Sequence, residues 1–134
     1  MANTTFSGPV RSENGFEQIT KNATTGAVTV SATYGASITG GVQSLSGAGA
    51  VDLTNLVTEL TTTGANALTL ADGTTSGQIK IVNMIVDGGD GTLTPTTFAN
   101  GTTITFYAVG ESATLVWNST VGWVATSTIG ATIA

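Results

Sequence analysis

The sequence predicts an all-β fold: an antiparallel β-sandwich body preceded by an extended N-terminal arm. One basis is composition. The 134-residue chain is rich in β-branched threonine and contains 18 glycines but only 2 prolines, which favours pleated strands joined by tight turns. The other basis is spacing, because short apolar runs recur roughly every 8–12 residues with turn-forming pieces between them, as in sandwiches and barrels. A chain of this length is expected to form one domain.

Charged residues make up only 8% of the chain, where about a quarter is usual. Because little electrostatic repulsion separates copies, we expect the uncharged surface to end in contact with other chains. The formal net charge is −5, and the basic residues are only Arg11, Lys21 and Lys80. Nucleic acid and anionic membranes are therefore disfavoured as partners. The opening MANTTFSGPV lacks the basic and apolar regions of a secretory signal, so we expect synthesis in a cytoplasm.

Residues 1–26 are predicted to form an extended docking arm. Scattered apolar residues stand among polar ones, and proline, glycine and asparagine break any sustained period. Such a segment gains order by docking on something larger, and a floppy terminus is the alternative. The docking role is assigned to Phe6, Pro9, Val10, Arg11, Phe16 and Ile19.

Residues 27–50 are predicted to hold one strand, 27–34, followed by a Gly/Ser-rich linker over 35–50. The β-sandwich body is expected over 51–134. Residues 51–62 are ambiguous because their leucines would also suit one face of a short helix. The predicted strands of the body are 51–62, 66–71, 78–86, 91–94, 102–109, 113–118 and 121–126.

The strand predicted at 78–86 is apolar on both faces. Ile79, Ile81 and Ile85 share one face, and the other face carries Val82, Met84 and Val86. One face of a small sandwich normally meets water, so a second apolar face suggests that another subunit covers it. The alternative is a central strand covered within its own chain. The subunit-packing role is assigned to Ile79, Ile81, Met84, Ile85, Trp117 and Trp123.

Few chemistries are open to this sequence. It contains no histidine and no cysteine, which excludes Ser-His-Asp and Cys-His catalysis and the metal sites built on those residues. Lys80 is expected to be solvated or paired rather than activated beside a serine. Asp87 and Asp90 could offer oxygens to a cation, but the DGGDG segment is more typical of a turn. No cofactor or metal is predicted.

Trp117 and Trp123 flank the turn residues Asn118, Ser119 and Thr120. This spacing predicts a hairpin that brings the two rings together. Paired aromatic rings can bind sugars, but they more often fill a core or an interface. We therefore favour packing over a sugar platform.

Two stretches carry a resemblance: FSGPVRSENGFEQI at the start, and the body from LTLADGTTSGQIKIVNMIVDGGDG to ATLVWNSTVGWVA. The chain resembles small β-rich virion structural proteins of marine tailed bacteriophages, which include head decoration and appendage proteins. The resemblance implies a β-sandwich or jelly-roll-like body that forms a homotrimer and assembles on a capsid.

The expected function is a non-enzymatic capsid decoration, or cement, protein on the outer capsid surface of the virion. Its partner would be the major capsid protein, which Arg11 of the arm would meet through an acidic group. The alternative is a receptor- or glycan-binding tip module of a phage tail appendage. An enzyme using Asp87 and Asp90 is a third hypothesis, although two loop carboxylates without a positioned third group make a poor active site.

Overall fold

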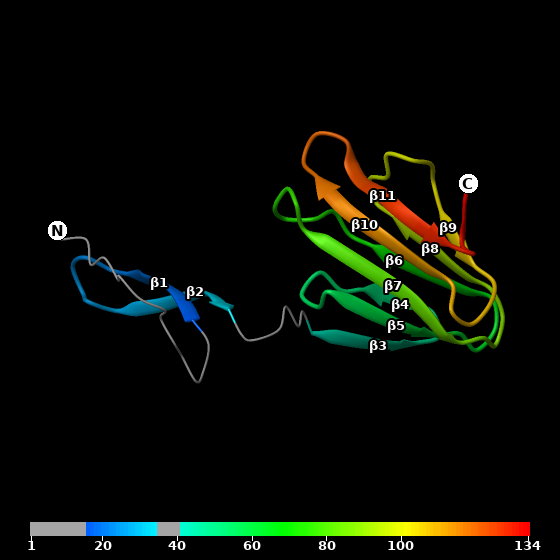
Figure 1. Ribbon diagram of the computed structural model, residues 1–134, viewed down its shortest axis with the longest axis horizontal. Helices are drawn as coiled ribbons and strands as arrows, with labels where there is room; N and C mark the ends of the chain where they lie inside the picture. Colours follow the sequence, from blue (N-terminus) through cyan, green and yellow to red (C-terminus); the bar gives the residue numbers. More distant parts are fainter. Residues whose placement is uncertain (1–15, 35–40) are drawn as a thin grey trace, which may run out of the picture. The chain divides into compact units, whose positions relative to one another are not determined.

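The computed structural model describes the backbone of residues 16–34 and 41–134, and the side chains of 21–29 and 41–134. The chain divides into two compact units, residues 1–39 and 40–134. Every regular element in the described residues is a β-strand (Figure 1). The prediction of an all-β fold is confirmed over this part of the chain.

The N-terminal unit contains a pair of antiparallel strands, β1 (Phe16–Lys21) and β2 (Val28–Tyr34). The turn between them is closed by Asn22, whose side-chain oxygen accepts hydrogen bonds from the backbone N–H groups of Thr24 and Thr25, each at 2.9 Å. The strand predicted at 27–34 thus pairs with residues inside the predicted arm. The first 15 residues lie outside the described part of the chain.

The body, residues 40–134, consists of two five-stranded sheets. The first sheet has the order β11-β10-β7-β5-β3, with strands Gly122–Ile129, Ser112–Asn118, Ile79–Val86, Val57–Thr61 and Val42–Ser46. The second has the order β12-β9-β8-β6-β4, with strands Thr132–Ile133, Ile104–Phe106, Gly91–Pro95, Asn66–Leu70 and Gly49–Val51. The linker predicted over 35–50 therefore contains β3 and most of β4.

From β3 to β8 the chain enters the two sheets alternately, like the turns of a flattened coil (Figure 1). Each turn of this coil contributes one strand to each sheet, and the three turns are β3–β4, β5–β6 and β7–β8. Equivalent strands of successive turns are parallel neighbours, so that Val57 lies between Val42 and Ile81 in one sheet. In the other sheet Leu68 lies between Gly49 and Leu93. The last four strands, β9 to β12, pair antiparallel.

The expected antiparallel sandwich is therefore wrong in its strand directions, because both sheets are mixed. The segments that were predicted to be turns explain the difference. Residues 62–65 connect β5 to β6 and residues 87–90 connect β7 to β8, and each connection crosses from one sheet to the other. A connection of this length serves a hairpin or a corner equally well, and residue types alone do not distinguish them.

The two connections that cross between the sheets, residues 62–65 and 87–90, lie in close contact with each other. Gly88 donates its N–H to the hydroxyl of Thr62 at 2.9 Å. A Cβ added at Gly88 would collide with the carbonyl oxygen of Thr62, and one added at Gly89 would meet the backbone of Gly64. Glycine is needed here because two chain segments come into backbone contact.

The core lies between the two sheets and is built from the inward-facing residues of both. Its largest fully buried apolar side chains are Trp123, Phe106, Leu60, Leu68, Leu70, Met84, Leu93, Ile104, Leu115 and Val82. In the described part of the chain, every buried side-chain nitrogen and oxygen has a hydrogen-bond partner. The same residues include no helix that is long and apolar enough to span a membrane.

Candidate protein-binding faces and a buried polar cluster

The outer face of the first sheet carries apolar side chains on its central strand, β7. Lys80, Val82 and Met84 point into the core and are at most 1% exposed. The residues between them face outward, and Ile79 is 46% exposed while Ile81 is half-buried. Both faces of β7 are therefore largely apolar, but within the body only the inner one is covered.

Neighbouring strands extend this apolar surface across the sheet. Val42 of β3 and Val57 of β5 are in register with Ile81. Ile79 is in register with Val116 of β10, which is in turn opposite Val124 of β11. Because residues two apart on a strand share a face, the two rows adjoin. We call this surface the apolar patch, and its members are Val42, Val57, Ile79, Ile81, Val116 and Val124.

The outer face of the second sheet also lacks charged side chains at its outward strand positions, but it carries small and hydroxyl side chains instead of large apolar ones. Its outward positions carry threonine and alanine, and they form rows across the strands. We call this surface the threonine face, and its members are Ala50, Thr69 and Thr94 in one row and Ala67, Thr92, Thr105 and Thr132 in the other.

The six residues predicted to pack between subunits are divided by the structure. Ile79, Ile81 and Ile85 lie on the outer surface of the body. Met84, Trp117 and Trp123 lie in the core, at 1%, 8% and 0% exposure. Their side chains are therefore already covered by their own chain.

The tryptophans meet as the hairpin prediction requires. Trp117 and Trp123 are opposite each other in the β10–β11 register, with ring centroids 5.4 Å apart and planes at 60°, an edge-to-face arrangement. The indole N–H of Trp123 donates to the carbonyl of Ala71 at 2.8 Å. This geometry is typical of core packing, and the buried rings offer no stacking platform to a sugar.

The predicted docking anchors cannot be placed in the same way. Phe6, Pro9, Val10 and Arg11 lie outside the described residues. Phe16 and Ile19 belong to β1, for which the structure describes the backbone.

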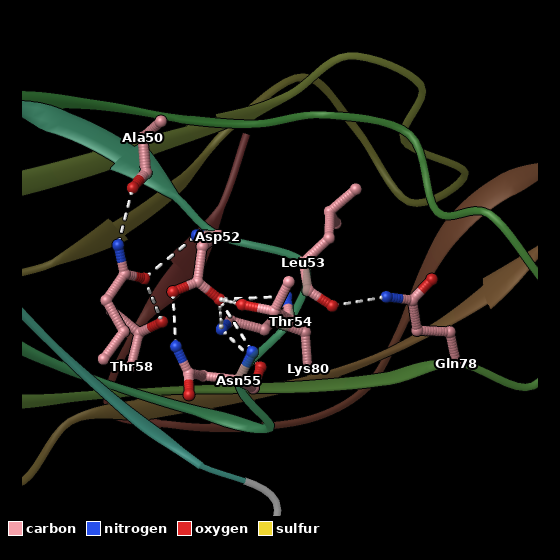
Figure 2. A network of polar contacts seen from close by, with 9 residues as sticks. Ala50, Asp52, Leu53, Thr54, Asn55, Thr58, Gln78 and Lys80 are labelled. Carbon is pink, nitrogen blue, oxygen red and sulfur yellow. Dashed lines mark hydrogen bonds and ion pairs between the residues drawn. The ribbon is translucent and has the colours of Figure 1, made fainter. Parts of the chain in front are cut away.

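A polar cluster that composition did not predict surrounds Lys80 (Figure 2). Lys80 is 1% exposed, and its ammonium group donates to the backbone carbonyl of Asn55 at 2.8 Å. It also lies 3.6 Å from a carboxylate oxygen of Asp52, whose side chain is 31% exposed. Lys80 was expected to be solvated or paired, and it is paired but buried.

Asp52 orders the corner between β4 and β5. Its carboxylate accepts hydrogen bonds from the backbone N–H of Thr54 at 3.1 Å and of Asn55 at 2.8 Å, and from the side-chain amide of Asn55 at 2.6 Å. Burial raises the pKa of Asp52, but these donors and the charge of Lys80 outweigh it and hold the pKa below its usual value. For Lys80 burial dominates and lowers the pKa, with Asp52 acting in the opposite direction.

Two glutamines complete the cluster. Gln78 donates to the carbonyl of Leu53 at 2.8 Å. Gln43 bridges the turn, because its amide nitrogen donates to the carbonyl of Ala50 at 2.8 Å and its oxygen accepts from the N–H of Asp52 at 2.9 Å. The cluster thus fastens the 52–56 corner to strands β3 and β7. No described serine contacts the Lys80 ammonium group through a hydrogen bond.

In the DGGDG segment the carboxylate of Asp87 is used in turn chemistry. Asp87 accepts a hydrogen bond from the N–H of Gly89 at 2.9 Å. Asp90 borders an open surface hollow of about 210 Å³, together with Ala65, Ala67 and Thr92. Within residues 16–34 and 41–134, no group of three or more acidic residues is arranged to hold a metal ion.

Comparison with known proteins adds no assignment: the chain matches no protein-family model and no curated protein.

Proposed function

We propose that this chain is a non-enzymatic structural module that works by packing its body against other protein chains. In the finer form of the proposal it is a capsid decoration protein, which binds the major capsid protein on the outer surface of a phage head. That placement rests on the resemblance of its sequence to virion structural proteins of marine tailed phages.

The apolar patch is the observation that carries the proposal. Isolated exposed apolar residues are ordinary, but a continuous group on one sheet face is typical of an interaction surface. Glu59 is the charged residue nearest the patch in the register, since it lies opposite Asn83 in the row that follows Ile81. A chain with 8% charged residues also has little repulsion to oppose such contacts.

The competing functions have less support from the geometry. A glycan-binding tip built on Trp117 and Trp123 would need accessible rings, and both rings are in the core. An enzyme based on Asp87 and Asp90 would need a third positioned group, whereas the Asp87 side chain caps its own turn. Neither alternative gains a specific observation in its favour.

Binding to a particle through many copies would stabilise it by mass action. A protein that binds only the assembled lattice lowers the free energy of that lattice by its binding free energy at each site. The proposal therefore requires no chemistry from the module. It requires complementary surface.

The test is co-sedimentation of the purified chain with undecorated phage heads, followed by cryo-electron microscopy of the loaded particles. Ile81→Lys places a charge at the centre of the apolar patch and is expected to abolish co-sedimentation. Thr94→Lys on the threonine face is the matched control, because it adds the same charge to the body at a site outside the patch. Unchanged binding of Ile81→Lys would exclude the apolar patch as the binding face. Failure of the native chain to co-sediment, or density on the tail alone, would overturn the placement on the capsid.

The docking arm is tested separately by truncation. Removing residues 1–26 would separate β1 from β2, so the cut is better made at residue 39, where the two compact units meet. Loss of capsid binding by a folded 40–134 fragment would support the arm, and full binding would refute it. The homotrimer implied by the resemblance stays a prediction, and the molecular mass of the free protein in solution tests it.

A further inference from the structure

The outer edge of β3 is a row of backbone hydrogen-bonding groups without a partner strand in the two sheets of the body, residues 40–134 (Figure 1). The carbonyl of Gly41 accepts a hydrogen bond from the N–H of Val57. The backbone N–H and C=O groups of the odd-numbered residues, Gln43 and Leu45, therefore also point toward β5. Alternate residues direct their N–H and C=O groups to opposite sides. Val42, Ser44 and Ser46 therefore direct theirs to the open edge.

The other three edges of the two body sheets are protected. On β11, Ala125 pairs with Leu115 and Ser127 with Thr114, which leaves Thr126 as an extra residue that bends the edge. The edge strand β12 has only two residues. The edge strand β4 has three residues. The side-chain amide of Gln43 hydrogen-bonds to the carbonyl of Ala50 and to the N–H of Asp52, and so takes the place of a neighbouring strand's backbone.

By contrast, β3 has none of the devices that keep edges from pairing. It is a regular five-residue strand, VQSLS, with no charge, no proline and no bulge in its register with β5. Native proteins normally block such an edge or use it for strand addition. The contrast with the three protected edges indicates use.

We propose that β3 pairs antiparallel with β3 of a second copy of this chain, about a two-fold axis at Ser44. In this register Ser44 lies opposite its own symmetry mate, and Val42 lies opposite Ser46. All edge-facing groups of these residues are then paired, and no charged side chains meet. The half-buried Leu45 also gains cover at the open end of the core, because it comes to lie opposite Gln43.

The choice of a second copy rests on this self-complementarity. Two-fold pairing of identical strands is closed, so it yields a dimer and leaves no further edge of the same kind. Pairing through β3 does not depend on the proposed function, since it uses the backbone edge, and Val42 is the one member of the apolar patch that lies on β3. The homotrimer implied by the resemblance would need a different surface.

The first test is the mass of the full chain by sedimentation equilibrium across a wide concentration range. A dimer is expected for the native chain. Ser44→Pro removes an edge-facing N–H without touching the ladder to β5, and is expected to raise the dimer dissociation constant about tenfold to a hundredfold, from the loss of two hydrogen bonds. Ser44→Ala keeps the N–H and is expected to leave the dimer unchanged.

A second variant keeps the proposal decidable if Ser44→Pro does not fold. The chain contains no cysteine, so Ser44→Cys introduces a single thiol. Directly opposed residues in a hydrogen-bonded antiparallel pair have Cα atoms about 5.5 Å apart, which is within disulfide range. Mild oxidation should link Ser44→Cys into a covalent dimer, and Thr94→Cys should stay unlinked.

A monomer at every concentration, a trimer, or a Ser44→Cys variant that does not cross-link faster than Thr94→Cys would overturn the proposal. A monomer would mean that another segment of the same chain or a foreign strand covers β3. If Ile81→Lys abolishes capsid binding while the dimer persists, the two surfaces act separately. If the native chain is dimeric but binds no capsid, the proposed function fails and the β3 pairing stands.

Discussion

Replacing Lys80 by methionine would separate the two contributions of this buried side chain. Methionine keeps most of the unbranched stem and loses the amine. The variant gives up a charge-assisted hydrogen bond of 2.8 Å to the carbonyl of Asn55, worth about 1.5–3 kcal/mol. It also gives up the contact with Asp52, worth less than about 1 kcal/mol because that carboxylate is 31% exposed.

These losses are opposed by desolvation. Burying an ammonium group costs several kcal/mol even in a relaxed protein interior, and a thioether avoids this cost. We therefore expect Lys80→Met to change the free energy of unfolding by less than about 2 kcal/mol. Lys80→Ala also removes the stem from the core, and the loss expected for such a truncation is about 2–5 kcal/mol.

Urea denaturation followed by tryptophan fluorescence is a suitable assay, because Trp117 and Trp123 both lie in the core. Lys21→Met is the matched control, since it removes the same charge from an exposed lysine. If Lys80→Met were as destabilising as Lys80→Ala, the contacts of the amine would carry the stability of this corner, and the assignment of the main contribution to stem packing would be refuted.

Three further outcomes are expected. The pKa of Lys80 is lowered in the folded state, so the unfolded chain binds this proton more readily. The free energy of unfolding should therefore rise as pH increases toward 10.5, the usual lysine pKa, and alkaline unfolding curves of Lys80→Met should lack that rise. Trp123→Phe loses the indole hydrogen bond and should lower the free energy of unfolding by at least about 1–3 kcal/mol in urea; no change would contradict its role. Gly88→Ala forces a methyl group against Thr62 and should cost about 1–3 kcal/mol, measured by thermal unfolding.

Alternation of apolar residues was sufficient to locate most strands of the body. The predicted strands 66–71 and 78–86 correspond to β6, Asn66–Leu70, and β7, Ile79–Val86. The hairpin around Asn118 is also present, with Trp117 opposite Trp123. These features depend on the two-residue period and on local turn chemistry, both of which are legible in a single sequence.

Strand direction and the edge strand were not legible in this way. A two-residue period is the same in parallel and antiparallel pairs, so the parallel stacking of Leu60 on Met84 left no local signal. Strand β3 was hidden because VQSLS has only two large apolar residues and lies in a Gly/Ser-rich segment. The inward direction of Lys80 depends on Asp52 and Asn55, which are distant in sequence and come close only in the folded chain.

The winding of β3 to β8 through the two sheets also constrains how this protein can vary in length. An insertion of a single strand after Leu70 would move every later strand into the opposite sheet and turn the inward face of β7 away from the core. An insertion of one strand for each sheet would preserve both. Longer or shorter versions of the body should therefore differ by whole turns of the coil, with the antiparallel strands β9 to β12 retained as the closing end.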